Sequence, residues 1–362
     1  MNKNQNGLEA IRARIDQLDS QLVELLSSRA ATVAEVARIK RAEGGSDNFY
    51  RPEREARILR RVIEMNPGPL SDEELGRLFR EIISACLALE QDVNIAYLGP
   101  EGTFTHDAAL KHFGHSARIT ALAGIDQVFR EVEAGHCQFG VVPVENSIEG
   151  VVNHTLDLLM NSTLQICGEV ELRIHQHLMS RAADLSGIRR VYSHQQSLAQ
   201  CRAWLNGKLP AAERIPVSSN SEAARMAAQE DGAAALAGTA AAEFHDLPIL
   251  ARNIEDAPDN TTRFLVLGRE SAAPSGRDKT SLLFTTPNRP GALFTMLKCF
   301  VEQGVSLSRI ESRPSRRGMW DYVFFVDLEG HAEDAPVAAA LAALQREAAM
   351  VRVLGSYPSG VL

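Results

Sequence analysis

An uninterrupted helical pattern near the N-terminus is the feature that most constrains this chain. From Leu8 to about Ala42, apolar residues recur every three or four positions, which is the spacing of one helix face. No glycine or proline interrupts this pattern before Gly44 and Gly45. A helix of about 35 residues is about 50 Å long, which is too long for one small domain to cover. We therefore expect it to pack against a partner chain.

Two shorter helices follow in the same region. One begins after Pro52 and runs to about Met65, where the sequence Asn-Pro-Gly-Pro ends it. The next begins at Ser71, which has a glutamate three residues later as in a capping box, and it continues to about Gln91. The sequence therefore predicts an all-α domain over residues 1–92 that forms a homodimer or a higher homo-oligomer.

The pattern changes after residue 92. Short apolar strands alternate with helical stretches over 93–270, which predicts a layered α/β domain. The predicted strands include VNIAYLG, FGVVPVE, RRVYSH and TRFLVLG. Residues 271–279 are rich in Ser, Ala, Pro and Gly and predict a linker. Residues 280–362, with a strand that starts at Trp320, follow the order βαββαβ of a ferredoxin-like unit.

Composition narrows the class of protein. The 362 residues suffice for two or three domains, and the net charge of −8 does not favour binding to nucleic acid or to an anionic membrane. The five cysteines are scattered without a CxxC pair, which argues against a disulfide framework and a structural zinc site. The polar N-terminus has no apolar signal core, and no apolar run approaches about 18 residues. We expect a cytoplasmic protein without a metal or cofactor.

Cations on the first helix are candidates for an anion site. Arg29 and Lys40 are eleven residues apart and about 20° apart in helical phase, and they lie near the apolar Val33 and Val36. Arg12 lies about 25 Å from Arg29 along the axis, so one small ligand cannot touch both on one helix. An antiparallel dimer would bring them together. Guanidinium groups suit a small dicarboxylate, although a solvated charged face is the plain alternative.

Residues 8–91 resemble the helical, type II chorismate mutase family. The resemblance is carried by LEAIRARIDQLDSQLVELLSSRAATVAEVARIK, YRPEREARIL and LFREIISACLALE. It implies a Claisen rearrangement of chorismate to prephenate, in which the enzyme holds the compact conformer and stabilises charge on the breaking ether oxygen. The binding residues that it implies are Arg12, Arg29, Lys40, Arg54 and Glu55, with Arg51, Cys86 and Glu90 at three positions that vary among relatives.

The resemblance also implies roles for some of these side chains. Arg12 and Arg29 would clamp carboxylates, Lys40 would donate to the ether oxygen and Glu55 would hold the ring hydroxyl. Relatives often carry glutamine where this chain has Glu90, and a glutamate can donate a hydrogen bond only when it is protonated. We therefore predict that mutase activity falls as pH rises through the pKa of Glu90, and that Glu90→Gln flattens this profile.

Four polar segments at the ends of predicted strands point to a second site. They are GPEGTFTHDAA (99–109), VPVENSIEGVVNHT (142–155), SHQQSLAQC (193–201) and DNTTRF (259–264). Loops beyond strand ends are where α/β proteins bind ligands. Residues such as Thr103, Asn153 and Ser193 are also common helix caps, but four such segments together favour a ligand cleft.

These segments resemble the prephenate dehydratase family over residues 94–270. The family motifs fall on Glu145-Asn146-Ser147, on Ser193-His194 with Gln196 and Gln200, and on Thr262-Arg263-Phe264. The resemblance implies two α/β lobes, like type II periplasmic binding proteins, with the chain crossing near residue 170 and returning near 250. It assigns proton donation to Thr262 and implies that Asn146, Ser193 and Gln200 orient the substrate. Because a threonine alone is a poor acid, we expect Thr262 to be polarised by Arg263 or to relay a proton. Thr261 is interpreted as a strand-entry residue.

The C-terminal unit resembles the ACT regulatory domain, through PNRPGALFTML and SRIESRPSRRGMWDY. The resemblance implies that phenylalanine binds between these segments at a subunit interface. The residues concerned are Gly291, Ala292, Leu293, Glu311, Ser312, Arg313 and Pro314. A plain dimerisation domain, with Arg313 in a surface salt bridge, is the alternative.

The order of the three units resembles the bifunctional chorismate mutase/prephenate dehydratase family of phenylalanine synthesis, which phenylalanine inhibits. Two other classes remain open. A non-catalytic amino-acid sensor would bind phenylalanine without turning over prephenate. A mutase fused to prephenate dehydrogenase would need a dinucleotide-binding GxGxxG after a strand, and GPEGTF does not fit that motif.

Overall fold

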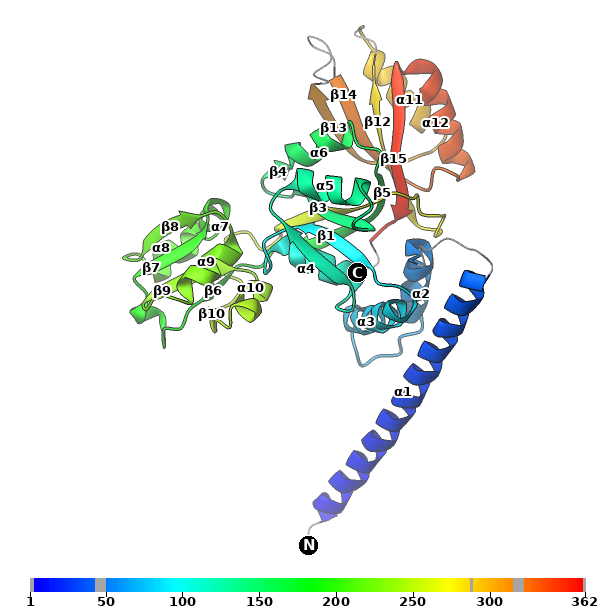
Figure 1. The fold of residues 1–362 in the computed structure, drawn as a ribbon. Helices are drawn as coiled ribbons and strands as arrows, with labels where there is room; N and C mark the ends of the chain where they lie inside the picture. The colour runs from blue at the N-terminus through cyan, green and yellow to red at the C-terminus, as the bar shows by residue number, and fades with distance from the viewer. Residues whose placement is uncertain (1–2, 43–49, 287–288, 315–321, 361–362) are drawn as a thin grey trace.

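The long N-terminal helix is present in the computed structural model, which describes residues 3–42, 50–286, 289–314 and 322–360. Helix α1 (Lys3–Ala42) extends away from the rest of the chain (Figure 1). The predicted breakers Gly44 and Gly45 lie outside the described residues. Every residue over 7–28 is exposed, including Leu25 at 68%, and packing against α3 begins at Arg29. Residues 7–28 of α1 therefore do not pack against the rest of the chain that the structure describes.

Helices α2 (Pro52–Glu64) and α3 (Asp72–Glu90) complete the helical domain. The Oγ of Ser71 accepts a hydrogen bond from the Glu74 amide at 3.2 Å, which confirms the predicted N-cap. Tyr50, just before α2, is only 4% exposed because its ring packs against Phe113 and Phe139 of the next domain. The helical domain is thus anchored in its neighbour by an aromatic side chain.

The first α/β lobe is built on a six-stranded sheet in the order β2-β1-β3-β11-β5, with the short β4 paired to β3. The first three strands in this order are parallel, whereas β11 runs antiparallel to both β3 and β5. The elements are β1 (Asn94–Leu98), α4 (Phe104–Phe113), β2 (Arg118–Leu122), α5 (Ile125–Glu133), β3 (Phe139–Asn146), β4 (Gly150–Val151), α6 (Asn153–Leu159), β5 (Gln165–Arg173) and β11 (Thr261–Gly268).

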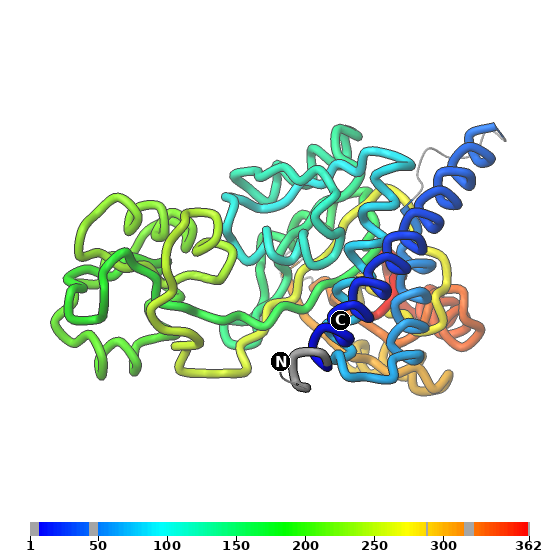
Figure 2. Tube along the Cα trace, turned by 90° about the horizontal axis from the view of Figure 1, so that it is seen from below, coloured from blue at the N-terminus to red at the C-terminus, as the bar shows by residue number. Residues whose placement is uncertain are grey.

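The second lobe has a five-stranded sheet in the order β10-β6-β9-β7-β8. Two chain segments, 174–176 and 252–260, cross between the lobes (Figure 2), close to the two predicted crossings. The elements are β6 (His177–Met179), a 3₁₀ turn (Leu185–Gly187), β7 (Arg190–His194), α7 (Gln195–Gln200), α8 (Arg202–Lys208), β8 (Glu213–Val217), α9 (Asn220–Ala227), β9 (Ala233–Ala237), α10 (Thr239–Phe244) and β10 (Ile249–Ala251).

The C-terminal unit has the predicted βαββαβ order and an antiparallel sheet, β13-β14-β12-β15. The predicted strand start at Trp320 lies outside the described residues, as do Pro287 and Asn288 of the first resemblance segment. The elements are β12 (Asp278–Thr285), α11 (Ala292–Val301), β13 (Leu307–Pro314), β14 (Tyr322–Glu329), α12 (Ala335–Glu347) and β15 (Met350–Pro358).

The C-terminal sheet is joined to the first lobe through a common core. One sheet face packs under α11 and α12, whereas the other contributes Leu283, Phe325 and Leu354 to the cluster that contains Val142 and Leu265 of the lobe. At Gly355 the β15 backbone lies so close to β5 that an added Cβ would stand 2.1 Å from the carbonyl oxygen of Ile166. These two units therefore share buried surface instead of being tethered by a loose linker.

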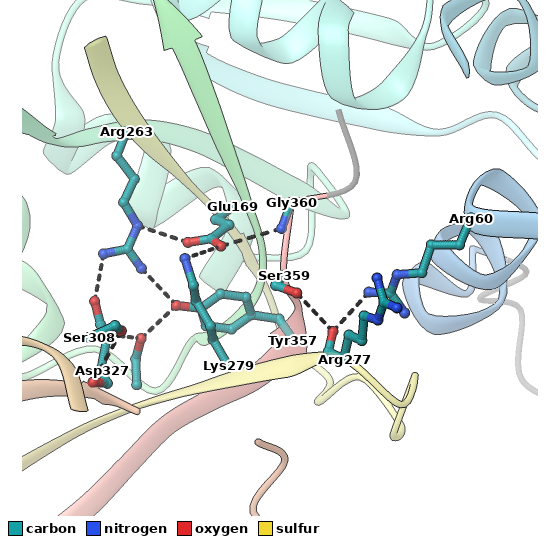
Figure 3. A network of polar contacts seen from close by, with 11 residues as sticks. Arg60, Glu169, Arg263, Arg277, Lys279, Ser308, Asp327, Tyr357, Ser359 and Gly360 are labelled. Carbon is teal, nitrogen blue, oxygen red and sulfur yellow. Dashed lines mark hydrogen bonds and ion pairs between the residues drawn. The ribbon is translucent and has the colours of Figure 1, made fainter. Parts of the chain in front are cut away.

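The segment predicted as a linker is also held in place. The guanidinium of Arg60 on α2 donates to the carbonyl oxygen of Ser275 at 3.2 Å. It also donates to the carbonyl oxygen of Arg277 at 2.8 Å (Figure 3). The Ser275 hydroxyl donates to Asp278 at 2.6 Å. The helical domain, the segment and the first strand of the C-terminal sheet are thus joined by polar contacts.

Candidate active sites

A pocket of about 160 Å³ lies among α1, α2 and α3. Every predicted mutase residue except Arg12 lines it. Those residues are Arg29, Lys40, Arg51, Arg54, Glu55, Cys86 and Glu90. Tyr50, which was not among the predicted site residues, also lines the pocket. Residues from three helices thus converge on one cavity, as the spacing on the first helix predicted for Arg29 and Lys40.

Arg29 and Arg12 differ in their surroundings. One terminal nitrogen of Arg29 is buried and has no hydrogen-bond partner within the described part of the chain, so it is available to an anion in the pocket. Arg12 lies on the exposed half of α1 and does not line the pocket of its own chain. Its proposed approach to the Arg29 of a second copy is a prediction that a single chain does not test.

The two carboxyl groups of the pocket are both partly desolvated. Burial raises the pKa of Glu55, and the Arg80 guanidinium, whose nitrogen lies 3.7 Å from the Glu55 carboxylate, opposes this rise. Burial also raises the pKa of Glu90, against the opposing effect of Lys40, Arg54 and Arg41. The raised pKa extends the pH range over which Glu90 is protonated.

A second cavity, of about 510 Å³, lies between the two α/β lobes. All four predicted polar segments contribute to its lining. Thr262 and Asn146 line it from the first lobe, and Gln200 lines it from the second. The first turns of α4 and α9 also border the cavity, from opposite lobes. The lining residues that the structure describes include no arginine or lysine.

Thr262 and Asn146 form the polar pair at the base of this cleft. They are register partners on β11 and β3, and the Asn146 amide nitrogen donates to the Thr262 Oγ at 2.8 Å. The Asn146 side-chain oxygen accepts from the backbone amides of Ile148 and Glu149, both at 3.0 Å, and this fixes the orientation of the amide group. Thr262 therefore accepts from Asn146 and keeps its own hydroxyl hydrogen for another acceptor.

A chain of amide side chains continues from this pair to the second lobe. Asn146 also donates to Asn260 at 2.7 Å, and Asn260 donates to Gln200 at 3.2 Å. Glu149 accepts from Gln196 and from Gln200 across the cleft. Asn260 was inside a predicted polar segment but was not singled out. Gln176 and Asn220, which also line the cleft, are isolated amides without a distinguishing pattern in the sequence.

The structure corrects two predicted positions in this site. The Arg263 guanidinium does not enter the cleft, because neighbouring side chains on a strand point to opposite faces. It binds Glu169, Asp327 and Tyr357 on the side that faces the C-terminal sheet. Ser193 is fully buried below the cleft, where its hydroxyl hydrogen-bonds to Asn220 at 3.0 Å and to the Leu236 carbonyl at 2.8 Å.

The predicted effector residues lie at the start of α11 and along β13. Gly291 precedes α11 with a left-handed φ of 78°, which glycine adopts readily, and Ala292 is buried while Leu293 is half-buried. On β13, Ser312 and Pro314 are exposed and Glu311 is half-buried. Arg313 is 9% exposed and pairs with Asp157 of α6 at 2.8 Å, so the alternative of a surface salt bridge for this residue is wrong.

Two other kinds of feature, a membrane-spanning helix and a metal site, were also sought among the described residues. No helix among the described residues is long and apolar enough to cross a membrane. No cluster of three or more His, Cys, Asp or Glu side chains there could hold a metal ion. The two cavities are thus lined by the chain's own amide, hydroxyl and charged groups.

Comparisons with known proteins agree with these two sites. Family models match in the order chorismate mutase type II (residues 11–91), prephenate dehydratase (95–272) and ACT domain (280–346). The chain is 53% identical over 362 residues to a bifunctional chorismate mutase/prephenate dehydratase of Pseudomonas aeruginosa, covering 99% of both chains. It is 45% identical to one of Aquifex aeolicus, covering 98% of this chain and 99% of the other.

A solved structure shares the two C-terminal units. It is a prephenate dehydratase from Arthrobacter aurescens in complex with L-Phe, with a TM-score of 0.68 and 38% identity over 74% of this chain and 90% of that chain. Fold and sites together define a three-part enzyme with a helical mutase unit, a two-lobed lyase unit and a regulatory unit. The chain belongs to the bifunctional chorismate mutase/prephenate dehydratase family.

Proposed function

We propose that this chain converts chorismate to prephenate and then prephenate to phenylpyruvate, in the synthesis of L-phenylalanine, with phenylalanine as feedback inhibitor. The observation that carries the proposal is the presence of both sites on one chain whose relatives along its full length bear both activities in their names. The sensor alternative and the dehydrogenase alternative account for only part of this arrangement.

The mutase step needs no covalent intermediate. Arg29, with Arg12 of a second copy, would bind the two carboxylates and hold chorismate in its compact conformer. Lys40 and protonated Glu90 would donate to the ether oxygen, where negative charge develops as its bond to carbon breaks. Glu55 would accept the hydrogen bond of the ring hydroxyl. The converging cations and the two desolvated carboxyl groups support these roles.

The dehydratase step removes the ring hydroxyl and a carboxylate together. The bond to the carboxylate breaks to release CO₂, its electron pair enters the ring, and the ring hydroxyl leaves as water with a proton from Thr262. A lone threonine is a poor acid, since its pKa is far above the operating pH. Donation from Asn146 stabilises the oxygen that loses the proton, so it takes the activating role that the sequence assigned to Arg263.

The cleft must bind a dianion without an arginine or lysine among its described lining residues. The first turns of α4 and α9 border the cavity from opposite lobes, and amide groups at helix N-termini favour anions. Closure of the lobes on prephenate would bring both ends to the substrate carboxylates. Gln200 would orient the substrate, and Ser193 would act only through Asn220, which it contacts below the cleft.

The assembly and the cellular location are part of the same proposal. The exposed apolar side chains of α1, among them Leu22 at 56% and Leu25 at 68%, would be covered by the same helix of a second copy. Phenylalanine would bind near the start of α11 and the end of β13 at a subunit interface. The five cysteines are all free and buried, which fits the reducing cytoplasm.

One assay tests the whole proposal. Purified protein is given chorismate or prephenate, and phenylpyruvate is followed with and without phenylalanine. We expect product from both substrates and less product when phenylalanine is present. Turnover of prephenate but not of chorismate would refute the bifunctional assignment and leave the dehydratase standing. Binding of phenylalanine without any turnover would instead support the sensor.

A further inference from the structure

The strand pair β3 and β11 carries different chemistry on its two faces. Thr262 is paired in register with Asn146, and the next pair is Arg263 with Glu145. Because successive side chains alternate between the faces of a sheet, the first pair lines the cleft and the second faces the C-terminal unit. The polar pair of the dehydratase site therefore has a charged pair directly behind it, on the same two strands.

Arg263 binds three residues on this rear face (Figure 3). Its Nε donates to Glu169 of β5 at 2.9 Å, one terminal nitrogen donates to Asp327 of β14 at 2.5 Å, and the other donates to the Tyr357 hydroxyl of β15 at 2.9 Å. Two of these three partners belong to the C-terminal sheet. The strand that carries Thr262 is thus fixed to two strands of the regulatory unit by one side chain.

Glu145 makes the matching contact from β3. Its carboxylate pairs with the Nε of Arg309 on β13 at 2.7 Å. The same β13 carries Glu311, Ser312, Arg313 and Pro314, the second of the two segments expected to bind the effector. Each of the two strands that carry Thr262 and Asn146 therefore contacts the regulatory unit through a charged side chain on the sheet face opposite the cleft.

These contacts are buried and balanced in charge. Glu169 and Asp327 are each 5% exposed, and Lys279 pairs with Glu169 at 2.6 Å, so two cations face two carboxylates. Burial lowers the pKa of Arg263, but the nearby Tyr357, Asp327 and Glu169 outweigh this and raise the pKa above its usual value, so the guanidinium stays charged. Removal of one member leaves an uncompensated buried charge, which the remaining groups can relieve only by moving.

We propose that Arg263 and Glu145 are positioning residues that fix the Thr262–Asn146 pair to the regulatory sheet, and that the effector changes dehydratase activity by moving this rear face. The inference rests on the proposed function. A shift of β13 or β14 by a fraction of an ångström moves Glu145 or Arg263, and each is joined by one peptide bond to a residue of the reacting pair. Small misplacements of a reacting group can cost up to about a hundredfold in rate.

The experiment compares Arg263→Gln, Arg263→Lys, Asp327→Asn and Tyr357→Phe with the unmodified protein. Dehydratase kcat and KM, mutase rate and the phenylalanine concentration for half inhibition are measured on the same samples. Arg352→Gln is the matched control, because Arg352 also joins β15 to the first lobe, but through the carbonyl oxygens of Leu159 and Ser162, away from the cleft. The mutase rate reports whether the helical unit of each variant is folded, and the thermal unfolding of each variant reports on the lobe and the C-terminal sheet.

We expect Arg263→Gln and Asp327→Asn to lower dehydratase kcat by about ten- to a hundredfold, with KM and mutase rate nearly unchanged. Both variants should also need more phenylalanine for half inhibition. Arg263→Lys should recover part of kcat, Tyr357→Phe should lose least, and Arg352→Gln should match the unmodified protein. If Arg263→Gln does not fold, the milder Arg263→Lys and Tyr357→Phe decide through kcat and phenylalanine sensitivity.

Three results would overturn the inference. A higher KM with unchanged kcat in the Arg263 variants would return this residue to direct substrate binding. Unchanged kcat and phenylalanine sensitivity in Asp327→Asn would show that the rear face transmits nothing, and an equal loss in Arg352→Gln would show that any weakened docking has this effect. Active unmodified protein with unaffected variants refutes the inference alone, whereas unmodified protein that turns over no prephenate refutes the proposed function itself.

Discussion

The mutase pocket and the dehydratase cleft are lined by different kinds of side chain. The pocket among the three helices is lined by Arg29, Lys40, Arg51 and Arg54 together with two carboxyl groups. The polar lining of the cleft between the lobes consists mainly of amides, hydroxyls and helix N-termini, with His194 and Glu149 beside them, and its described lining has no arginine or lysine. On the proposed function both sites bind prephenate, one as product and the other as substrate. The same dianion would therefore be bound mainly by cationic side chains in the pocket and mainly by neutral donors in the cleft.

The difference follows from what each reaction needs. In the rearrangement, charge develops on an ether oxygen, and a nearby cation lowers the energy of that transition state directly. In the dehydration, a proton must be delivered to a leaving hydroxyl, and fixed neutral donors can do this if they are held in place. The basic residue expected in the cleft, Arg263, is used behind it to hold the strand.

The largest expected effect concerns the proton donor. Thr262→Ala should lower dehydratase kcat by about a hundred- to ten-thousandfold, the usual contribution of general acid catalysis. Thr261→Ala is the matched control, since the Thr261 hydroxyl donates only to a backbone oxygen of the neighbouring loop, that of Asp259 at 3.4 Å. Phenylpyruvate formation from prephenate measures both variants. A greater loss in the Thr261 variant would mean that the donor is the other threonine.

The next effect tests the cationic pocket. Arg29→Gln should lower mutase kcat by about a hundredfold, because Arg29 holds chorismate in its compact conformer and misplacement of the reacting atoms costs about that much. Dehydratase kcat on the same sample should not change. Arg77→Gln on α3 serves as control, because Arg77 forms an exposed pair with Glu74 on the surface. An unchanged mutase rate in Arg29→Gln would contradict the view that the mutase pocket depends on its cationic side chains.

A smaller effect concerns pH. Protonated Glu90 donates a hydrogen bond, so mutase activity should fall about tenfold per pH unit once the pH exceeds its pKa. Burial raises this pKa, which moves the fall to higher pH than for an ordinary glutamate. Glu90→Gln keeps the donor at every pH and should flatten the profile. The pH dependence of chorismate turnover in both proteins checks this, and identical profiles would exclude Glu90 from the mechanism.

The smallest effect is that of salt on binding. Added salt screens the attraction between exposed cations and an anionic substrate. The KM for chorismate should therefore rise several-fold between low salt and about 0.5 M salt, whereas the KM for prephenate in the cleft should rise less. Steady-state kinetics of the two half-reactions on one preparation give both values. An equal rise in the two KM values would contradict the distinction between the sites.

Much of this organisation could be predicted from the sequence because it depends on local periodicity. The long first helix, the Ser71 cap and each element of the βαββαβ order rest on patterns within one helix or strand and the residues that flank it. Convergence of Arg29 and Lys40 on one pocket follows from helix geometry. The direction of Arg263 was also open to prediction, since a residue next to the cleft-facing Thr262 on a strand must face away.

Other features of the sites could not be predicted, for physical reasons. What Arg263 binds depends on the packing of β14 and β15, whose Asp327 and Tyr357 follow it in sequence by 64 and 94 residues. The isolated amides Gln176 and Asn220 become meaningful only when two lobes face each other across a cleft. The role of Arg12 depends on a second copy of the chain, which no pattern within one chain describes.

Tyr50 has a consequence for anyone who wishes to separate the two activities on two polypeptides. A cut after residue 92 follows the change in sequence pattern, but it takes from the lyase fragment an aromatic side chain that packs on Phe113 and Phe139 and bonds to His112 at 2.9 Å. Loss of a buried aromatic ring commonly costs about 3–5 kcal/mol. The lyase fragment would contain a cavity where the Tyr50 ring packs in the intact chain. A designed split should therefore keep a short peptide with Tyr50 on the lyase fragment, or fill the cavity with a larger side chain.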